Sequence, residues 1–389
     1  MKGRTGSLIR VLILFSIIMF SLHRPPDDRR GRGAVVYAAG AGQAVTPPLP
    51  EKQEVLALLE KANSWQLAHP EMKPDDRDWQ RATWYTGVMA AWKATGNAAW
   101  LNQALAWGRR HAWQVGTEPD GANRLFCVET WAELYLARHD PAMIEPAIRW
   151  LATPDPLTPA GSSQWYLDHY GDNPGAVYVD SLYGAAALAM LSKATGDAKY
   201  LDIMNAFFDD VTGQLLDQDE GLYYRDRRFI GQRTTNGKKI LWSRGNGWAF
   251  AGIARVLEYL PPNHPSRESY LEVFRRQAAE LVKRQGADGL WRVNLDDPGQ
   301  FPNPETSGTG FFCFGLAWGI NQGVLDRRAY LPAAEKAWAG LTASLSPEGA
   351  VQWGQQVDGQ PHAVARDSTH EFVTGTFLLA GSEMYKLAR

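Results

Sequence analysis

Cysteine is scarce in this chain of 389 residues, which contains only Cys127 and Cys313, each within apolar helical sequence. Two thiols at this spacing form no metal-ligand motif. We expect both to be buried and free, with a disulfide between them as the alternative. Charge of one sign is also lacking, because 40 basic residues nearly balance 42 acidic ones. This balance gives no electrostatic basis for binding nucleic acid or an anionic membrane surface, so we expect a small polar ligand.

Long apolar runs are missing as well, with one exception near the N-terminus. The stretch from Val11 to Leu22 follows a basic start, and its length suits a signal-peptide core while falling short of a membrane span. We therefore expect residues 1–39 to be a signal peptide, or alternatively an uncleaved N-terminal anchor, and the protein to be exported to the periplasm or the extracellular space. Residues 40–50 lack periodic apolar positions and are interpreted as a linker before a folded domain over 51–389.

The folded domain repeats one sequence pattern, in which an apolar-periodic helix, a Gly or Asn/Asp stop and a second helix follow one another. Two similar segments contain Ala-Thr-Gly followed by Asn or Asp, at Gly96 with Asn97 and at Gly196 with Asp197. The glycine suits the left-handed conformation that ends a helix, and the next side chain can accept hydrogen bonds from the first amides of the following helix. The turns between paired helices are therefore specified by local chemistry.

About twelve helical stretches follow from this periodicity. They are 52–68, 80–95, 98–114, 125–138, 142–152, 177–195, 198–212, 244–259, 267–285, 307–322, 330–344 and 370–387. A single helical hairpin cannot bury its own apolar face, whereas six hairpins can close into a ring with one helix of each pair inside. We therefore predict an all-α fold, a single (α/α)6 barrel of six helical hairpins, rather than two domains. A linear helical solenoid is the alternative.

Tryptophan and tyrosine are abundant, with 16 and 14 residues respectively. Flat aromatic faces stack on the apolar faces of sugar rings, although large aromatic side chains also fill helical cores. We predict sugar contacts for Trp84, Trp242 and Trp248, and the last two are the stronger candidates because they are grouped with an arginine. The composition thus favours a carbohydrate ligand.

Asp180 is the candidate acid, because it lies inside the helix predicted over 177–195 among Tyr178, Val179 and Leu182. Such neighbours would desolvate its carboxyl and raise its pKa toward the range of a general acid. The alternative is a helix-capping aspartate exposed to water. His169 precedes it in a polar loop and is a further candidate for ligand contact.

Two other junctions between a loop and a helix combine polar residues with glycine. In the segment 242–248, Arg244 could hold a carboxylate through two hydrogen bonds, and Asn246 lies beside the two glycines that let a ligand approach the backbone. A tight turn with the arginine stacked on tryptophan is the alternative. Glu305 and Thr306 precede a helix whose free amides could bind an anion, and simple helix capping is the alternative there.

These motifs together resemble the unsaturated uronyl hydrolases of glycoside hydrolase family 105, which is related to family 88. The resemblance rests on YVDSLYGAA from Tyr178, LYYRDRR from Leu222, WSRGNGW from Trp242, DGLWR from Asp288, NPETSGTGFF from Asn303 and the closing FLLAGSEMYKL. The motifs occur in order over about residues 80–388, and WSRGNGW together with PETSGTGFF is the most specific combination. Members of the family are (α/α)6 barrels, so the resemblance implies the same fold.

The resemblance implies a hydration rather than an ordinary glycoside hydrolysis. Polysaccharide lyases leave a C4=C5 double bond in the terminal uronic acid, and these enzymes protonate C4, add water to C5 and form a hemiketal that opens and expels the rest of the chain. By this resemblance Asp180 is the catalytic acid, Arg244 and Trp248 hold the uronate, and no metal or cofactor takes part. The alternatives are a conventional glycosidase or an epimerase on the same barrel, or an inactive carbohydrate-binding protein.

One position departs from the family pattern. Many members carry a second Asp at the start of an earlier inner helix, where this chain has Asn123 and Arg124. Asp120 or Glu129 could take over that role. Because the stereochemistry at C4 is lost in the double bond, the resemblance covers unsaturated uronates of both gluco and galacto origin.

Overall fold

The computed structural model of the protein describes residues 49–73, 75–118, 121–153 and 177–389. The chain divides into two compact units, 1–45 and 46–389, and all described residues belong to the second. The expected signal peptide or anchor, Asp120 and His169 lie outside the described residues. Within the described part of the chain, no helix is both long and apolar enough to span a bilayer.

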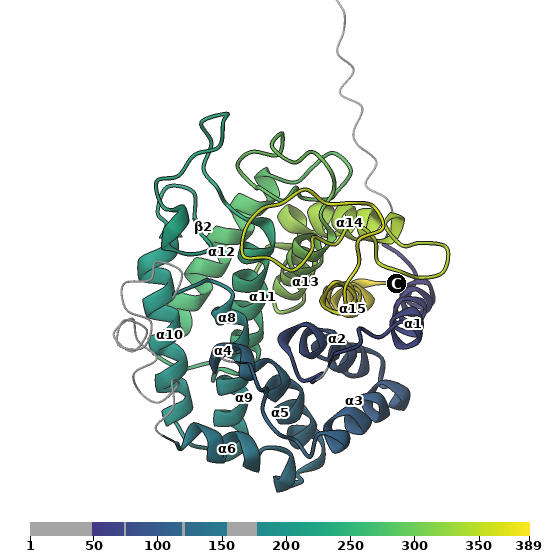
Figure 1. The fold of residues 1–389 in the computed structure, drawn as a ribbon, viewed down its shortest axis with the longest axis vertical. Coiled ribbons are helices and arrows are strands. Elements are labelled where there is room, and N and C mark those ends of the chain that lie inside the picture. Colours follow the sequence, from purple (N-terminus) through teal and green to yellow (C-terminus); the bar gives the residue numbers. More distant parts are fainter. Residues whose placement is uncertain (1–48, 74, 119–120, 154–176) are drawn as a thin grey trace, which may run out of the picture. The chain divides into compact units, whose positions relative to one another are not determined.

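The described residues form helices and one short ribbon of two strands (Figure 1). The α-helices are α1 (Lys52–Ala68), α2 (Trp79–Thr95), α3 (Ala98–Arg110), α4 (Gly121–Arg124), α5 (Phe126–Arg138), α6 (Glu145–Leu151), α8 (Ser181–Gly184), α9 (Ala186–Thr195), α10 (Lys199–Leu215), α11 (Ser243–Tyr259), α12 (Arg267–Lys283), α13 (Thr306–Asn321), α14 (Arg327–Ala343) and α15 (Glu371–Leu387). Two 3-10 turns are η1 (Pro141–Met143) and η2 (Arg227–Phe229). Strands β1 (Leu216–Asp217) and β2 (Leu222–Tyr223) pair in antiparallel orientation.

Six inner helices contact one another in a closed ring, in the order α2, α5, α9, α11, α13, α15 and back to α2. Outer helices pack against them: α3 on α2, α10 on α9, α12 on α11, α14 on α13 and α1 on α15, while η1 and α6 take this place beside α5. Figure 1 shows the ring with each outer helix beside its partner. This arrangement confirms the predicted (α/α)6 barrel, because each hairpin buries one face against the neighbouring inner helices.

The turns that the sequence predicts are present. Gly96 and Gly196 have φ angles of 70° and 77°, in the left-handed region that favours glycine. Asn97 and Asp197 each accept a hydrogen bond from the backbone amide two residues later, at 3.0 Å in both cases. Local side-chain chemistry therefore ends one helix and starts the next, as expected.

The ring closes where α2 meets α15, and glycine makes that contact possible. A Cβ atom on Gly375 would lie 2.3 Å from the carbonyl oxygen of Thr83, and one on Gly87 would lie 2.5 Å from the carbonyl oxygen of Gly375. Only a residue without a side chain allows two helix backbones to approach so closely. The first and last inner helices are therefore locked together by their glycines.

The helix predicted over 177–195 begins later than expected. Val179 donates its backbone N–H to the carbonyl of Arg225 at 2.9 Å, and Tyr178 forms a β-bridge with Asp226. These contacts hold the residues before Ser181 outside the helix, so Asp180 lies at the N-terminal boundary of α8 and not inside a helix. Its side chain makes no capping hydrogen bond.

Candidate active site

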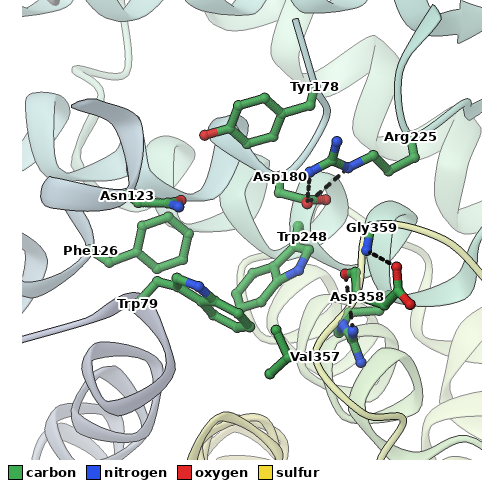
Figure 2. A pocket seen from close by; sticks show the side chains of 11 residues that line it. Trp79, Asn123, Phe126, Tyr178, Asp180, Arg225, Trp248, Val357, Asp358 and Gly359 are labelled. Carbon is green, nitrogen blue, oxygen red and sulfur yellow. Dashed lines mark hydrogen bonds and ion pairs between the residues drawn. The ribbon is translucent and has the colours of Figure 1, made fainter. Parts of the chain in front are cut away.

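A pocket of about 340 Å³ lies at the N-terminal ends of the inner helices (Figure 2). Its lining residues are Trp79, Asn123, Phe126, Tyr178, Asp180, Arg225, Arg244, Trp248, Val357, Asp358 and Gly359. The volume is near the lower end of the range for small-ligand sites, which is about 300–1,000 Å³. Because helix N-terminal ends carry partial positive charge, their convergence favours an anionic ligand.

Asp180 faces this pocket with one oxygen engaged and the other without a partner. Oδ2 accepts long hydrogen bonds from Nε and Nη2 of Arg225, at 3.4 and 3.3 Å. Oδ1 is buried and has no hydrogen-bond partner among the described residues. Burial raises the pKa of Asp180 above its usual value, Arg225 and Arg244 partly oppose that rise, and Asp226 adds to it. A carboxyl in this state can hold a proton and deliver it to a ligand.

Arg225 is one of the lining residues that the sequence analysis missed, as are Trp79, Phe126 and the segment 357–359. Its guanidinium lies 4.7 Å from the centre of the Tyr178 ring, and Nη1 donates to Asp226 at 2.9 Å. Asp226 is also held by Arg228 through two hydrogen bonds of 2.8 and 2.7 Å. The motif LYYRDRR contains Arg225, but its place in the pocket depends on the backbone contact with Val179, a residue distant in sequence.

Asn246 was predicted to contact the sugar, but it does not line the pocket. Its buried amide holds β2 instead, because Oδ1 accepts from the N–H of Tyr223 at 2.8 Å and Nδ2 donates to the carbonyl of Tyr223 at 2.9 Å. Tyr223 precedes Arg225 closely in the chain. Asn246 therefore positions the segment that carries Arg225 into the pocket.

Arg244 lines the pocket, but its terminal nitrogens bind the protein's own backbone. Nη1 donates to the carbonyl of Gln355 at 2.7 Å, and Nη2 donates to the carbonyls of Gln356 and Asp358 at 2.8 and 3.3 Å. The guanidinium lies 4.7 Å from the Trp242 ring, and burial lowers its pKa to about 10. The structure thus shows the arginine stacked on tryptophan that was the alternative interpretation of this motif. The predicted grip on a uronate would have to use Nε, which has no partner among the described residues.

Trp242, Glu305 and Thr306 were also predicted to bind substrate, and none of them lines the pocket. Trp242 donates its indole N–H to the side chain of Gln355 at 2.7 Å. Glu305 caps α13 by accepting the amides of residues 307 and 308 at 2.8 and 2.7 Å, so those amides are not free for an anion. Thr306 donates its hydroxyl to the carbonyl of Gln352 at 2.8 Å. Together with Arg244, these residues hold the segment 352–358, which carries part of the pocket wall.

The tryptophans divide between the core and the pocket. Trp84, which was predicted to contact the sugar, is buried in the core, donates its indole N–H to Asn63 at 2.9 Å and does not line the pocket. Trp248 lines the pocket as predicted, and Trp79 stands edge-on to it at 5.7 Å between ring centres. Trp79 is half-buried and supplies apolar surface on which a sugar ring can stack, whereas Trp248 is 2% exposed and borders the pocket from the core. Both cysteines are buried and free, as expected.

No second acid replaces the missing aspartate among the described candidates. Asn123 lines the pocket and supplies a neutral amide there. Glu129 lies away from the pocket, with Oε2 2.5 Å from Nε of Arg255, so it cannot take over the role. The carboxyl of Asp358 turns away from Asp180 in Figure 2, accepting its neighbour's amide at 2.6 Å. Asp180 is therefore the acid that this pocket presents to a ligand.

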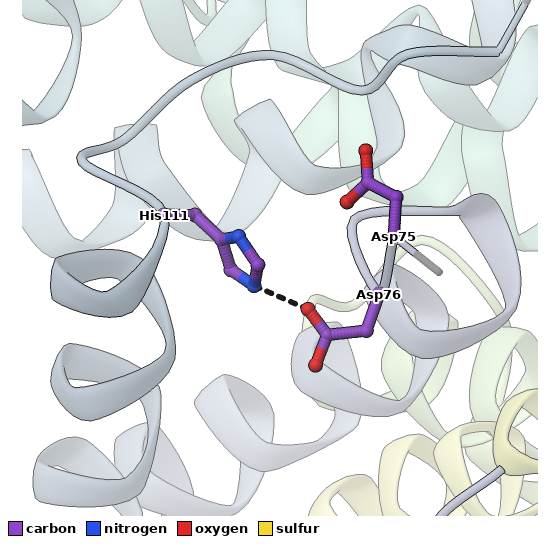
Figure 3. Close-up of side chains that lie close together, drawn as sticks. All are labelled: Asp75, Asp76 and His111. Carbon is purple, nitrogen blue, oxygen red and sulfur yellow. Dashed lines mark ion pairs between the residues drawn. The ribbon is translucent and has the colours of Figure 1, made fainter. Parts of the chain in front are cut away.

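A cluster of Asp75, Asp76 and His111 has the residue types of a metal site (Figure 3). Asp75 already forms two hydrogen bonds with Arg77, at 2.9 and 2.7 Å. Asp76 pairs with His111 and, at 2.5 Å, with Arg110. Because arginines neutralise both carboxylates, the cluster is better explained as an ion-pair network than as a cation site.

Comparison with known proteins identifies the family. Residues 57–388 match the model of Glycosyl Hydrolase Family 88. The chain is 34% identical to an unsaturated 3S-rhamnoglycuronyl hydrolase of Formosa agariphila, over 86% of this chain and 91% of the relative. A solved structure of a family 88 glycosyl hydrolase from Bacteroides vulgatus matches with a TM-score of 0.75 and 30% identity, over 86% of this chain and 99% of that one. The unsaturated glucuronyl hydrolase of Bacillus sp. GL1 shares the fold, with a TM-score of 0.61 and 16% identity over 87% and 97% of the two chains. In agreement with the resemblance of its motifs, the chain belongs to Glycosyl Hydrolase Family 88.

Proposed function

We propose that this glycoside hydrolase removes the terminal 4,5-unsaturated uronic acid from lyase-generated oligosaccharides, with Asp180 as the proton donor. The observation that carries the proposal is the state of the Asp180 carboxyl, which lines the pocket half-buried, is bound to Arg225 through Oδ2 and has no partner on Oδ1 among the described residues. A conventional glycosidase needs two carboxylates on either side of the scissile bond. Hydration of a double bond needs a single proton donor, and among the described lining residues Asp180 is the carboxyl placed beside Arg225 to serve as one.

The reaction begins with transfer of the proton from the Asp180 carboxyl to C4. Positive charge then develops at C5 and the ring oxygen, and a water molecule adds to C5 while Asp180 takes back one proton from that water. The resulting hemiketal opens at its C5–O5 bond, which leaves a ketone at C5 and a hemiacetal at C1. Collapse of that hemiacetal to an aldehyde breaks the bond to the rest of the chain and releases it as a free sugar. One water is consumed, and Asp180 ends in the protonated state in which it started. The indole of Trp79 provides stacking surface for the flattened ring, and Trp248 borders the pocket beside it.

The substrate is proposed to carry rhamnose next to the unsaturated uronate. Support comes from the Formosa agariphila relative, whose name specifies a 3S-rhamnoglycuronyl substrate and which aligns with most of this chain. A panel of unsaturated disaccharides tests this. One group contains glucuronyl-rhamnose units with and without a sulfate, and the other contains pectin-, glycosaminoglycan- and gellan-type units. The highest kcat/KM should fall on a rhamnose-linked uronate, and a preference for another aglycone would refute this part of the proposal.

The reaction itself is tested by ultraviolet absorbance. The conjugated double bond of the unsaturated uronate absorbs, so a hydrolase of this kind should erase the absorbance when given the disaccharide. Cleavage of the saturated uronide at a comparable rate would indicate a conventional glycosidase. Binding without any loss of absorbance would indicate a carbohydrate-binding protein.

Export is proposed as well. It is supported by the basic start and the apolar stretch from Val11 to Leu22, whose length suits a signal peptide. Cell fractionation together with the mass of the mature N-terminus tests it. Cleavage near residue 39 would support a signal peptide, an intact membrane-bound chain would support an anchor, and an intact cytosolic chain would refute both.

A further inference from the structure

The pocket contains two arginines, and they differ in how their N–H groups are used. Both terminal nitrogens of Arg244 bind backbone carbonyls of the segment 355–358, at 2.7 to 3.3 Å. Nε of Arg244 has no partner among the described residues, but Nη2, its neighbour on the same edge, is already engaged, so Arg244 offers a carboxylate no free pair of parallel N–H donors there. Arg225 instead directs Nε and Nη2 at the same oxygen of Asp180, at 3.4 and 3.3 Å, which lies beyond the usual length of a charged hydrogen bond. These two N–H groups are the ones that an incoming anion can take over most easily.

The rest of Arg225 is held firmly. Nη1 donates to Asp226 at 2.9 Å, and the guanidinium lies over the ring of Tyr178. Asp226 is fixed in turn by Arg228. The guanidinium is therefore anchored on its far side, while the edge formed by Nε and Nη2 faces Asp180. That edge has the fork geometry that binds a carboxylate through two parallel hydrogen bonds.

Resting on the function proposed above, we propose that the carboxylate of the bound uronate displaces Asp180 from Arg225, and that this exchange loads the proton that Asp180 later gives to C4. The uptake is a simple protonation in which the Asp180 carboxylate gains one proton from solvent. No bond of the substrate changes at this stage. The proton leaves Asp180 only when C4 receives it.

The charged groups around Asp180 determine in which direction substrate binding shifts its pKa. The charged groups that face Asp180 are Arg225, from the segment after β2, Arg244, from α11, and Asp226, which acts in the opposite sense. When the substrate carboxylate occupies Arg225, Asp180 loses the attraction of that cation and gains a neighbouring anion. Both changes raise its pKa. Binding should therefore take up a proton at any pH between the pKa values of the free and the bound enzyme, and affinity should fall as pH rises through that window.

Turnover provides the first test, using an unsaturated glucuronyl-rhamnose disaccharide. The pH dependence of kcat/KM reports the acid in the free enzyme, and that of kcat reports it in the complex. Both should fall with rising pH, and the fall of kcat should lie at a higher pH than the fall of kcat/KM. In Arg225→Gln, KM should rise about 10- to 100-fold and the two falls should lie closer together than in the wild type, because only the effect of the added anion remains. Arg225→Lys keeps the charge but not the fork, so part of the separation should remain.

Arg275→Gln serves as the matched control, because Arg275 lies on α12 outside the pocket and pairs with Glu268 at the surface. Its pH profiles should match those of the wild type. Coinciding falls of kcat/KM and kcat in the wild type would overturn the proposal, and so would a wild-type KM in Arg225→Gln. If the wild type erases the absorbance but its kcat/KM and kcat fall at the same pH, the carboxylate exchange is refuted and the proposed function stands. If the wild type does not erase the absorbance, the proposed function is refuted.

A binding measurement needs no turnover and no variant of Arg225. Calorimetry with saturated methyl glucuronide in two buffers of different ionisation enthalpy gives the number of protons taken up. The wild type should take up a fraction that approaches about one proton per bound ligand within the window. Asp180→Asn should bind the ligand without proton uptake. Zero uptake by the wild type across the whole pH range would overturn the proposal.

Discussion

Arg255 shows how this fold accommodates a charge in its interior. Its side chain is 1% exposed, with Nε 2.5 Å from Glu129 and Nη2 3.3 Å from Glu133. A buried ion pair adds little stability over apolar packing, but removal of one partner leaves the other charge desolvated and unpaired. Glu129, Glu133 and Asp180 each have one carboxyl oxygen without a partner among the described residues, but only Asp180 of the three lines the pocket.

The first prediction concerns Arg255. Arg255→Met should lower the free energy of unfolding by about 3–5 kcal/mol, since Glu129 loses its cation within the core. Denaturant unfolding measures this. Arg275→Met removes a surface arginine whose partner is exposed, and should cost less than about 1 kcal/mol. Equal losses in the two variants would contradict the assigned role of the interior pair.

At the scale of single residues, the sequence predicted which side chains matter better than what they contact. Asp180, Arg244 and Trp248 do line one pocket. Trp242, Asn246, Glu305 and Thr306 hold the backbone around that pocket instead. A polar residue beside glycines has the same local sequence whether it faces a ligand or a carbonyl of the chain. Only the folded structure distinguishes the two cases.

Among the elements, those set by local chemistry were predictable and those set by distant contacts were not. The ends of α2 and α9 follow from Gly96 and Gly196. The late start of α8 depends on the bridge between Tyr178 and Asp226, which no pattern within the helix indicates. The same bridge brings Arg225 to Asp180, which is why the sequence analysis did not identify that arginine.

A prediction at the scale of elements concerns the contact of α2 with α15. Gly375→Ala places a Cβ atom 2.3 Å from a backbone oxygen of α2, so the two helices must move apart. We expect a loss of about 1–3 kcal/mol in the free energy of unfolding, measured by denaturant titration.

The matched control is Gly213→Ala in α10, where an added Cβ meets nothing within 4 Å. That change should stabilise the protein by about 0.5–1 kcal/mol, because alanine is the better helix former. Stabilisation by both substitutions would show that α2 and α15 do not depend on the glycine contact.

At the scale of the whole described unit, the chain segment before α1 contacts the segment after α15. Lys52 donates its N–H to the carbonyl of Arg389 at 3.1 Å, and Arg389 donates its N–H to the carbonyl of Pro50 at 3.2 Å. The ring is therefore closed by backbone contacts as well as by helix packing. The pocket residues, from Trp79 to Gly359, come together only because the ring gathers the N-terminal ends of its inner helices.

A circular permutant tests this closure. Joining residue 389 to residue 49 through a short linker and opening the chain between Pro262 and Asn263, in the exposed loop after α11, should give a folded and active enzyme. Circular dichroism and loss of substrate absorbance measure both properties. Opening the chain between Gly252 and Ile253, inside buried α11, should prevent folding. Failure of the first permutant to fold would contradict the account of ring closure.

The central claim is that Asp180 donates the proton to C4, and the Asp180→Asn variant tests it most directly. Asparagine keeps the shape of the side chain but cannot donate this proton. With unsaturated disaccharide as substrate, the account predicts that circular dichroism and substrate affinity are retained, while the rate of absorbance loss falls by a factor of at least about 10² to 10⁴. A variant that erases the absorbance at the wild-type rate would contradict it.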